Sequence, residues 1–361
     1  MTRLLIVLLI FFCGIANAAD TKLSVTKQIV DDLLIPWGMD LIGENRLIVT
    51  MREGDIVLVE LDSGKTTQVS GAPVVLAKGQ GGLLDVKKSP NYASDGWLYF
   101  TYVKALRGQG ATTLARARLQ QHKLTNWQEL LVSQSRTRHS RHFGSRIAFD
   151  NLGHVYFSIG DRGIRDSAQD LTNHVGSIIR LNLDGTIPSD NPFINTADVL
   201  PEIYSYGHRN PQGLVFDQST AQLWAIEHGP RGGDELNLIK PGRNYGWPVV
   251  SHGKEYMLPI AVGEGTTKKG FEDPIQVYIP SIAPSSLLLK RSSQGATQFF
   301  IGALKLTHLN HLTLHKNKVV NQQRHLQALG ERIRNVIDGG NNTLIIATDK
   351  GQILRVAIDG G

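Results

Sequence analysis

Six short hydrophobic runs recur along the sequence, and most of them follow a turn-forming cluster of Gly, Asn and Asp. The runs are Leu47–Thr50, Leu98–Thr101, Val155–Ser158, Leu223–Ile226, Phe299–Gly302 and Leu344–Ala347. Successive runs begin 45 to 76 positions apart. Short apolar runs bounded by turn residues predict strands, and no long helical periodicity stands out between them. The pattern therefore indicates an all-β protein.

A repeat of about 40–50 residues with loop insertions is typical of the blades of a β-propeller. Six runs predict a six-bladed β-propeller, in which residues just past the ends of the innermost strands line a shared pocket. The alternative is a large β-sandwich, but sandwich strands usually repeat every ~8–12 residues without this longer period. No linker divides the chain, so we expect one domain over residues 19–361.

The N-terminus has the pattern of a signal peptide. Arg3 supplies a positive charge, Leu4–Phe12 is an apolar run too short to span a bilayer, and Ala16–Ala18 forms a small-x-small cleavage site. We expect residues 1–18 to be removed and the protein to be exported, either periplasmic, secreted or peripheral at the outer membrane. Cys13 would leave with this segment, so the mature chain would lack disulfides and depend on its core or on metal ions.

Composition narrows the functional classes. Hydrophobic residues make up 41% of the 361 residues and charged residues 19%, which excludes a disordered or fibrous protein. The net charge of +6 is spread along the chain, which fits an anionic small ligand, and we expect no nucleic-acid partner. No other apolar stretch is long enough for a membrane helix. The signatures of serine hydrolases, P-loop proteins, HExxH metalloproteases and dinucleotide-binding folds are absent.

Three local patterns suggest chemistry. The segment Glu227–Glu235 predicts an irregular loop with exposed carbonyl groups and carboxylates, which are ligands that Ca²⁺ prefers; the alternative is an ordinary turn with solvated acids. Arg332 and Arg334 lie on one face of a strand and repel each other unless an anion lies between them; the alternative is two solvated arginines. His142 lies beside arginines that should lower its pKa, as a general base needs; the alternative is an ordinary loop histidine.

A fourth pattern is weaker. His308, His311 and His315 form a histidine-rich stretch that could hold a transition metal. The stretch has no carboxylate partner and little turn support, so structural histidines are the favoured interpretation.

Eight segments, taken in order, resemble the soluble PQQ-dependent glucose/sorbosone dehydrogenase family, and most closely its bacterial periplasmic aldose sugar dehydrogenases. They are Pro36–Met39, Gly79–Asp85, His142–Gly144, Gly207–Gly213, Glu227–Glu235, Asn244–Pro248, Phe300–Lys305 and Arg332–Arg334. The resemblance runs from about Pro36 to the C-terminus. It implies a six-bladed propeller, in agreement with the repeat. It also implies oxidation of aldose sugars at C1 to the lactone, with electrons passed to an external acceptor that the sequence does not identify.

The resemblance implies PQQ as the cofactor, an o-quinone with three carboxylates that lies in the mouth of the propeller. His142 corresponds to the base that takes the proton of the sugar C1 hydroxyl while hydride passes to the quinone. Asp161, at the end of the third repeat strand, is the nearest candidate to hold the His142 imidazole. Arg209 and Asn210 correspond to residues on the quinone side. The remaining correspondences to cofactor contacts are Gln80, Lys305, Arg332 and Arg334.

The resemblance also implies two Ca²⁺ ions. The carbonyl groups of Gly229 and Pro230 correspond to ligands of an ion that bridges to PQQ and polarises it. Glu235 and the Tyr245 carbonyl correspond to a second, structural site. Arg141 departs from the pattern, because some relatives have an acid or amide beside the base, and this leaves the orientation of His142 open.

Two other functions stay open for a propeller of this kind. A Ca²⁺-dependent lactonase needs a central cage of Asp, Glu and Asn side chains on one ion, but no cluster of Lys305, Arg332 and Arg334. A non-catalytic sugar-binding propeller needs pocket aromatics, but neither a base nor an anion site. The sequence is compatible with a monomer or a dimer.

Overall fold

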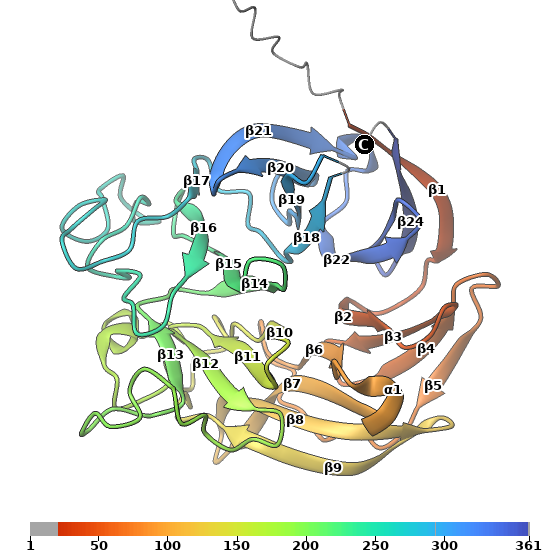
Figure 1. Cartoon of the computed structure of the whole chain (residues 1–361), viewed down its shortest axis with the longest axis horizontal. Coiled ribbons are helices and arrows are strands. Elements are labelled where there is room, and N and C mark those ends of the chain that lie inside the picture. Colours follow the sequence, from red (N-terminus) through yellow and green to blue (C-terminus); the bar gives the residue numbers. More distant parts are fainter. Residues whose placement is uncertain (1–20, 293, 360–361) are drawn as a thin grey trace, which may run out of the picture.

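The computed structural model describes residues 21–292 and 294–359, and β-strands make up nearly all of its regular structure. The strands form six four-stranded sheets arranged as blades around a common axis (Figure 1). The predicted six-bladed β-propeller is therefore confirmed. The predicted signal peptide, residues 1–18 with Cys13, lies outside the described residues.

The first three blades follow one another in chain order, each beginning with its innermost strand. Blade 1 consists of β2 (Pro36–Leu41), β3 (Arg46–Met51), β4 (Ile56–Glu60) and β5 (Thr66–Val69). Blade 2 consists of β6 (Leu83–Lys88), β7 (Trp97–Leu106), β8 (Gln109–Gln120) and β9 (Lys123–Val132). Blade 3 consists of β10 (Ile147–Phe149), β11 (His154–Ile159), β12 (Ser177–Asn182) and β13 (Ile203–Tyr206).

The other three blades continue around the ring. Blade 4 consists of β14 (Pro211–Asp217), β15 (Gln222–Glu227), β16 (Asp234–Ile239) and β17 (Gln276–Tyr278). Blade 5 consists of β18 (Leu288–Arg291), β19 (Thr297–Gly302), β20 (Leu309–His315) and β21 (Lys318–His325). Blade 6 consists of β22 (Ile333–Gly340), β23 (Thr343–Thr348), β24 (Ile353–Asp359) and β1 (Lys22–Val30).

Helices are short and lie in the connections. They are α1 (Tyr92–Asp95) and the 3₁₀ turns η1 (Arg165–Gln169) and η2 (Gln327–Leu329). None of the helices within residues 21–292 and 294–359 has the length and apolar character needed to cross a membrane.

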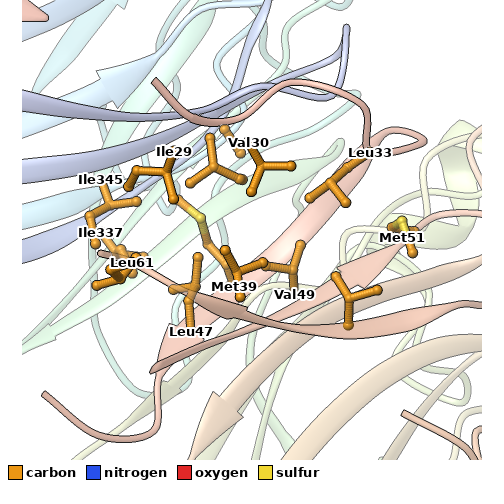
Figure 2. Packing of buried hydrophobic residues seen from close by; sticks show 14 residues of the cluster. Ile29, Val30, Leu33, Met39, Leu47, Val49, Met51, Leu61, Ile337 and Ile345 are labelled. Atoms are coloured by element: carbon orange, nitrogen blue, oxygen red, sulfur yellow. The ribbon is translucent and has the colours of Figure 1, made fainter. Parts of the chain in front are cut away.

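The ring is closed by pairing the two ends of the chain. Strand β1 runs antiparallel along β24, with Lys22 opposite Asp359 and Val30 opposite Ile353 (Figure 1). Blade 6 therefore takes its outermost strand from the N-terminal segment and its other three strands from the C-terminal segment. Figure 2 shows the apolar cluster where blades 6 and 1 meet, which includes Ile29, Leu33, Met39, Leu47, Val49, Ile337 and Ile345. Closure thus buries apolar side chains in addition to completing a hydrogen-bonded ladder.

The six repeated runs form the second strand of each blade, not the strand that lines the axis. A second strand is covered by neighbouring sheets on both faces, which explains why these runs are buried throughout and mostly apolar. Three runs end in a hydroxyl residue that donates a hydrogen bond to a carbonyl group of the next blade. These bonds are Thr50 to Leu84 at 2.5 Å, Thr101 to Ser145 at 2.6 Å and Ser158 to Pro211 at 3.1 Å.

A single guanidinium group connects all six blades. Arg146, at the start of blade 3, is 4% exposed and donates hydrogen bonds to one acceptor in each of the other five blades. The acceptors are Trp37 O, Asp85 Oδ1, Gln212 O, Ser285 O and Arg334 O, at 2.6 to 3.3 Å. A group that reaches every blade must lie at the axis. Burial lowers the pKa of Arg146 to about 10, so the guanidinium is still charged at neutral pH, with Asp85 as its buried counter-ion.

Candidate active site

The predicted site residues converge on one end of the central channel. They line four adjoining cavities of about 230, 20, 280 and 400 Å³. Gln80, Arg209 and His228 each border three of these cavities, so the four form one connected region. The residues that line it include Gln80, His142, Asp161, Arg209, Asn210, Gly229, Pro230, Glu235, Tyr245, Lys305, Arg332 and Arg334.

Propeller topology explains this convergence. Gln80, His142 and Asn210 precede the innermost strands of blades 2, 3 and 4, whereas Asp161 and Lys305 follow the second strands of blades 3 and 5. The first two strands of each blade are antiparallel. The beginning of one strand therefore lies at the same end of the channel as the end of the other.

His142 and Asp161 form a closely hydrogen-bonded pair. Nδ1 of His142 lies 2.6 Å from Oδ1 of Asp161. The same oxygen accepts the backbone N–H of Gly163 at 2.7 Å, and Oδ2 accepts the indole N–H of Trp247 at 2.8 Å. An ionised carboxylate only accepts hydrogen bonds, so Nδ1 of His142 carries the proton. The lone pair of Nε2 is then free for a ligand in the cavities that His142 lines.

The backbone at His142 adopts a conformation that is uncommon for a residue with a side chain. Its φ angle is 55°, and its N–H donates to Oε1 of Gln80 at 2.7 Å. Gly144 follows with a φ angle of 63°, and a Cβ there would lie 2.6 Å from the Ser158 carbonyl oxygen. The turn therefore requires glycine at this position. Local strain of this kind is often concentrated at functional sites.

The surroundings keep the imidazole neutral and the carboxylate ionised. Burial lowers the pKa of His142, and the charges of Arg209 and Arg141 add to this shift, which Asp161 opposes. Burial alone would raise the pKa of Asp161, but its hydrogen bonds from His142 and Gly163 bring the pKa below its usual value. Two arginines thus lower the pKa of His142: its chain neighbour Arg141, and Arg209, which precedes the first strand of blade 4.

Arg209 is a buried cation whose guanidinium group forms no direct ion pair with a carboxylate of the described residues. The residue is 6% exposed, and Nη1 and Nη2 donate to the His228 carbonyl at 3.1 Å and the Tyr256 hydroxyl at 3.2 Å. Nε has no acceptor among the described residues. A buried charge without a counter-ion is unfavourable, so an anionic ligand at this position would stabilise it. Asn210, which is 1% exposed, lines the neighbouring cavity.

Arg332 and Arg334 line the 230 Å³ cavity, but a carboxylate of the protein already lies between them. Asp349 accepts from Nε of Arg332 at 2.6 Å and from Nε of Arg334 at 2.7 Å. The anion that we expected between the two guanidinium groups is therefore present in the protein itself, as the carboxylate of Asp349. Two cations against one anion still leave a net positive charge at the cavity wall.

The loop after β15 gathers backbone carbonyl groups. A Cβ on Gly229 would collide with the carbonyl oxygens of Gly232 and Gly233, so only glycine permits so tight a loop. Asp234 stabilises it by accepting the Gly229 N–H at 2.9 Å. Over the ranges 21–292 and 294–359, nothing donates a hydrogen bond to the carbonyl groups of Gly229 and Pro230. Carbonyl oxygens without donors are suitable ligands for a hard cation.

Next to this loop, a cavity of about 20 Å³ is lined by Glu227, Glu235 and Tyr245, among others. Burial, with the charges of Glu227 and Asp234, raises the pKa of Glu235 to about 8. Negative charge around so small a space suits one divalent cation. Among the described residues, no three or more His, Cys, Asp or Glu side chains are arranged to hold a metal. An ion here would thus complete its ligand set with carbonyl groups such as that of Tyr245.

The histidine-rich stretch does not gather around a metal position in the part of the chain that the structure describes. His308 and His311 are buried, whereas His315 is exposed at the end of β20. The His311 ring stacks on Phe300 with 4.5 Å between ring centroids. The buried ring of His311 thus contributes to the packing of blade 5.

Two residues that shape the site carry little signal in the sequence. Trp247, which holds Asp161, stands out only by its place in the Asn244–Pro248 segment. Asp349, which holds the two arginines, follows the sixth hydrophobic run much as Asp161 follows the third. An acidic residue shortly after a repeat strand could therefore have marked both carboxylates.

The axis argues against the lactonase alternative. That chemistry needs a central cage of acidic and amide side chains around one ion. Here the axis holds the guanidinium group of Arg146 with Asp85 as its one carboxylate. A metal cation would have to occupy the position of an existing positive charge.

Comparisons with known proteins agree with this geometry. The family model described as Glucose / Sorbosone dehydrogenase matches residues 33–355. The aldose sugar dehydrogenase YliI of Escherichia coli K12 is 34% identical over 345 residues, with 92% of this chain and 93% of that protein covered.

Solved structures of similar proteins share the whole architecture. The soluble aldose sugar dehydrogenase of Escherichia coli, in its apo-form, has a TM-score of 0.87 at 33% identity, with 93% of this chain and 99% of that chain covered. The PQQ-bound form of the aldose sugar dehydrogenase of Streptomyces coelicolor has a TM-score of 0.80 at 28% identity, with 94% and 99% covered. This chain therefore belongs to the glucose/sorbosone dehydrogenase family and is an oxidoreductase.

Proposed function

We propose that this protein oxidises aldose sugars at C1 to the lactone, with PQQ as its bound cofactor and an external electron acceptor. The observation that carries the proposal is the convergence of one candidate base, His142, with the positively charged Arg209, Arg332 and Arg334 at one end of the channel. Membership of the family and the PQQ-bound relative support the same cofactor.

The pocket suits a planar quinone with three carboxylates. Two of its adjoining cavities measure about 230 and 400 Å³. Their lining carries excess positive charge, because Arg209 has no directly paired carboxylate in the described part of the chain and Arg332 and Arg334 share one. Such a quinone, when bound, supplies a two-electron acceptor for the hydride of the sugar. The residues that we assign to its polar contacts are Gln80, Asn210, Arg209, Lys305, Arg332 and Arg334.

His142 acts as the general base in this proposal. Its Nε2 removes the proton of the C1 hydroxyl, while Asp161 holds the ring through Nδ1 and stabilises the imidazolium that forms. Arg209 stabilises negative charge that develops on the accepting side of the pocket. Asp161 and Arg209 are buried and the side chain of His142 is only 12% exposed, so little water can weaken these interactions.

Two Ca²⁺ sites are part of the proposal. The carbonyl oxygens of Gly229 and Pro230, which accept no hydrogen bond from the described residues, are assigned to an ion beside the cofactor. Glu235 and the carbonyl group of Tyr245 are assigned to a second, structural ion in the 20 Å³ cavity. The first ion acts as a Lewis acid, and the second neutralises buried carboxylate charge.

We also propose that the mature enzyme is one domain over residues 19–361 and works outside the cytoplasm after loss of residues 1–18. The basis is the leader pattern and the placement of the one cysteine, Cys13, within it.

Reconstitution tests the catalytic proposal. Protein stripped with a chelator is incubated with PQQ and Ca²⁺, and reduction of an electron-accepting dye is followed with a panel of mono- and disaccharides. We expect dye reduction that requires PQQ, Ca²⁺ and an aldose together, and a lactone as product. Omitting each component in turn provides the control.

Three outcomes would contradict the proposal. PQQ that binds, by its change in absorbance, without oxidation of any aldose would rule out the assigned reaction. Hydrolysis of lactones without PQQ would favour the lactonase. Sugar binding without any turnover would favour a non-catalytic propeller.

A further inference from the structure

We propose that Trp247 is a positioning residue for the base, because its indole N–H holds Asp161, which in turn holds the imidazole of His142. The part of this inference that concerns catalysis, namely that His142 is a base, rests on the proposed function. The contact itself, however, can be tested in the protein without cofactor, so the two can fail separately.

The carboxylate of Asp161 accepts two hydrogen bonds on Oδ1 but only one, from Trp247, on Oδ2 among the described residues. Oδ1 is used by His142 and by the backbone N–H of Gly163, at 2.6 and 2.7 Å. Oδ2 receives the Trp247 indole N–H at 2.8 Å, and no other donor among the described residues. Asp161 is 1% exposed, so water cannot readily replace this donor. Without it, the carboxylate would lose the contact that defines its plane and would be free to rotate away from Nδ1 of His142.

Trp247 is itself firmly held. The residue is 5% exposed, its backbone N–H donates to Gly207 O at 2.9 Å, and its carbonyl accepts from Nε2 of Gln169 at 2.7 Å. The guanidinium carbons of Arg209 and Arg165 lie 5.2 and 5.4 Å from the indole ring. A donor anchored on its backbone and on its ring can fix the direction of the carboxylate that it contacts.

Several charged or titratable groups surround His142 and Asp161 and act on their titration. His142 faces Asp161, Arg209, Arg141 and His228. Asp161 also faces Arg162 and Arg165.

Burial with the charge of Arg209 lowers the pKa of His228 to about 3, so this neighbouring imidazole is uncharged at neutral pH. The titratable groups that the Trp247 indole holds are Asp161 directly and His142 through Asp161. A hydrogen bond to the carboxylate anion lowers the proton affinity of the pair. Removing that bond must therefore raise the pH at which the pair is protonated.

The variant Trp247→Phe removes the N–H donor and keeps an aromatic ring. In the cofactor-free protein, the NMR titration midpoint of His142, assigned with His142→Asn, should rise by about one pH unit. In the reconstituted enzyme, the acid limb of the pH–rate profile should rise with it. We expect kcat to fall about tenfold with the KM for the sugar unchanged.

Trp224→Phe is the matched control. Trp224 is a buried tryptophan of the same blade, and its Nε1 has no hydrogen-bond partner among residues 21–292 and 294–359. This variant should leave both titrations unchanged. A folded Trp247→Phe protein with the wild-type His142 midpoint and acid limb would overturn the inference.

If Trp247→Phe does not fold, the unsubstituted protein decides the question. The indole N–H resonance of Trp247 should move with pH at the same midpoint as His142. A resonance that is insensitive to pH across that midpoint would overturn the inference. Absence of sugar oxidation, in contrast, would count against the proposed function and leave this test of the contact intact.

Discussion

Arg334 and Asp349 form a two-point ion pair, with Nε to Oδ1 at 2.7 Å and Nη2 to Oδ2 at 2.9 Å. Oδ2 also accepts from Nε of Arg332. Burial would raise the pKa of Asp349, but its hydrogen bonds with Arg334 and Arg332 bring the pKa below its usual value. The carboxylate therefore holds both guanidinium groups in place before an anion arrives, which lowers the entropy cost of binding it.

Arg332→Ala should weaken the affinity for PQQ about tenfold, because one charge-assisted contact to a cofactor carboxylate is lost. The KM for the sugar should stay the same, since Arg332 lines the 230 Å³ cavity and not the cavities that His142 borders. Titration of the apoprotein with PQQ measures the effect. Arg46→Ala, at an exposed ion pair with Glu60, is the control, and equal PQQ affinities for Arg332→Ala and the parent would refute the assignment.

His142→Ala should retain PQQ binding and lose most turnover. General-base catalysis contributes typically 10²–10⁴-fold, so kcat should fall by about that factor while the PQQ dissociation constant stays unchanged. His139→Ala tests a histidine three positions away whose side chain is exposed, and it should turn over normally. Wild-type dye reduction by His142→Ala would remove this residue from the mechanism.

Asp85→Asn should destabilise the whole propeller. Removing one partner of a buried ion pair leaves the other charge uncompensated, which costs about 3–5 kcal/mol. Here the charge left behind is that of Arg146, 5% exposed in its side chain and bonded to every blade. Urea unfolding measures the loss. Glu60→Gln, in the exposed pair with Arg46, should cost less than about 1 kcal/mol, and a similarly small loss for Asp85→Asn would argue against the axial role.

Glu235→Gln should abolish stabilisation by Ca²⁺ at the second proposed site. A ligand that binds only the folded state stabilises it by about 2.7 kcal/mol at a hundred times its dissociation constant. Thermal unfolding with and without Ca²⁺ measures this effect. Glu264→Gln changes a glutamate whose side chain is 67% exposed and should keep the wild-type response. A full Ca²⁺ response in Glu235→Gln would show that this residue is no ligand.

His311 should make the fold sensitive to acid. Burial and the nearby His325 lower its pKa to about 4, against about 6.5 in an unfolded chain. The neutral ring therefore contributes its full stability above about pH 6.5, and this contribution, about 3 kcal/mol, is lost as the pH falls towards 4. Urea unfolding between pH 4 and 7 measures the slope. His311→Phe should flatten the slope and exposed His315→Gln should not; an unchanged slope in His311→Phe would contradict the prediction.

The sequence by itself determined the architecture and supplied the candidate residues of the site. Five blades are local units of four strands in chain order, and blade 6 has three such strands together with β1. The buried second strand of every blade repeats as a largely apolar run, so six runs sufficed to count the blades. The distinctive side chains stand in short motifs, and their types alone indicate a base, cations and oxygen ligands. For this reason His142 and the loop at Gly229 could be proposed from residue types, whereas Arg209 was proposed only through the resemblance to the family.

Only the tertiary structure decided which residues hold these groups in place. Trp247 reaches Asp161 across 86 positions, and Arg146 reaches Arg334 across 188. Such contacts exist because closure of the ring brings equivalent ends of all six blades to one place, which no local pattern records. The pairing of β1 with β24 is this closure itself. The position of Asp349 between two arginines depends instead on the antiparallel pairing of β22 with β23 within blade 6.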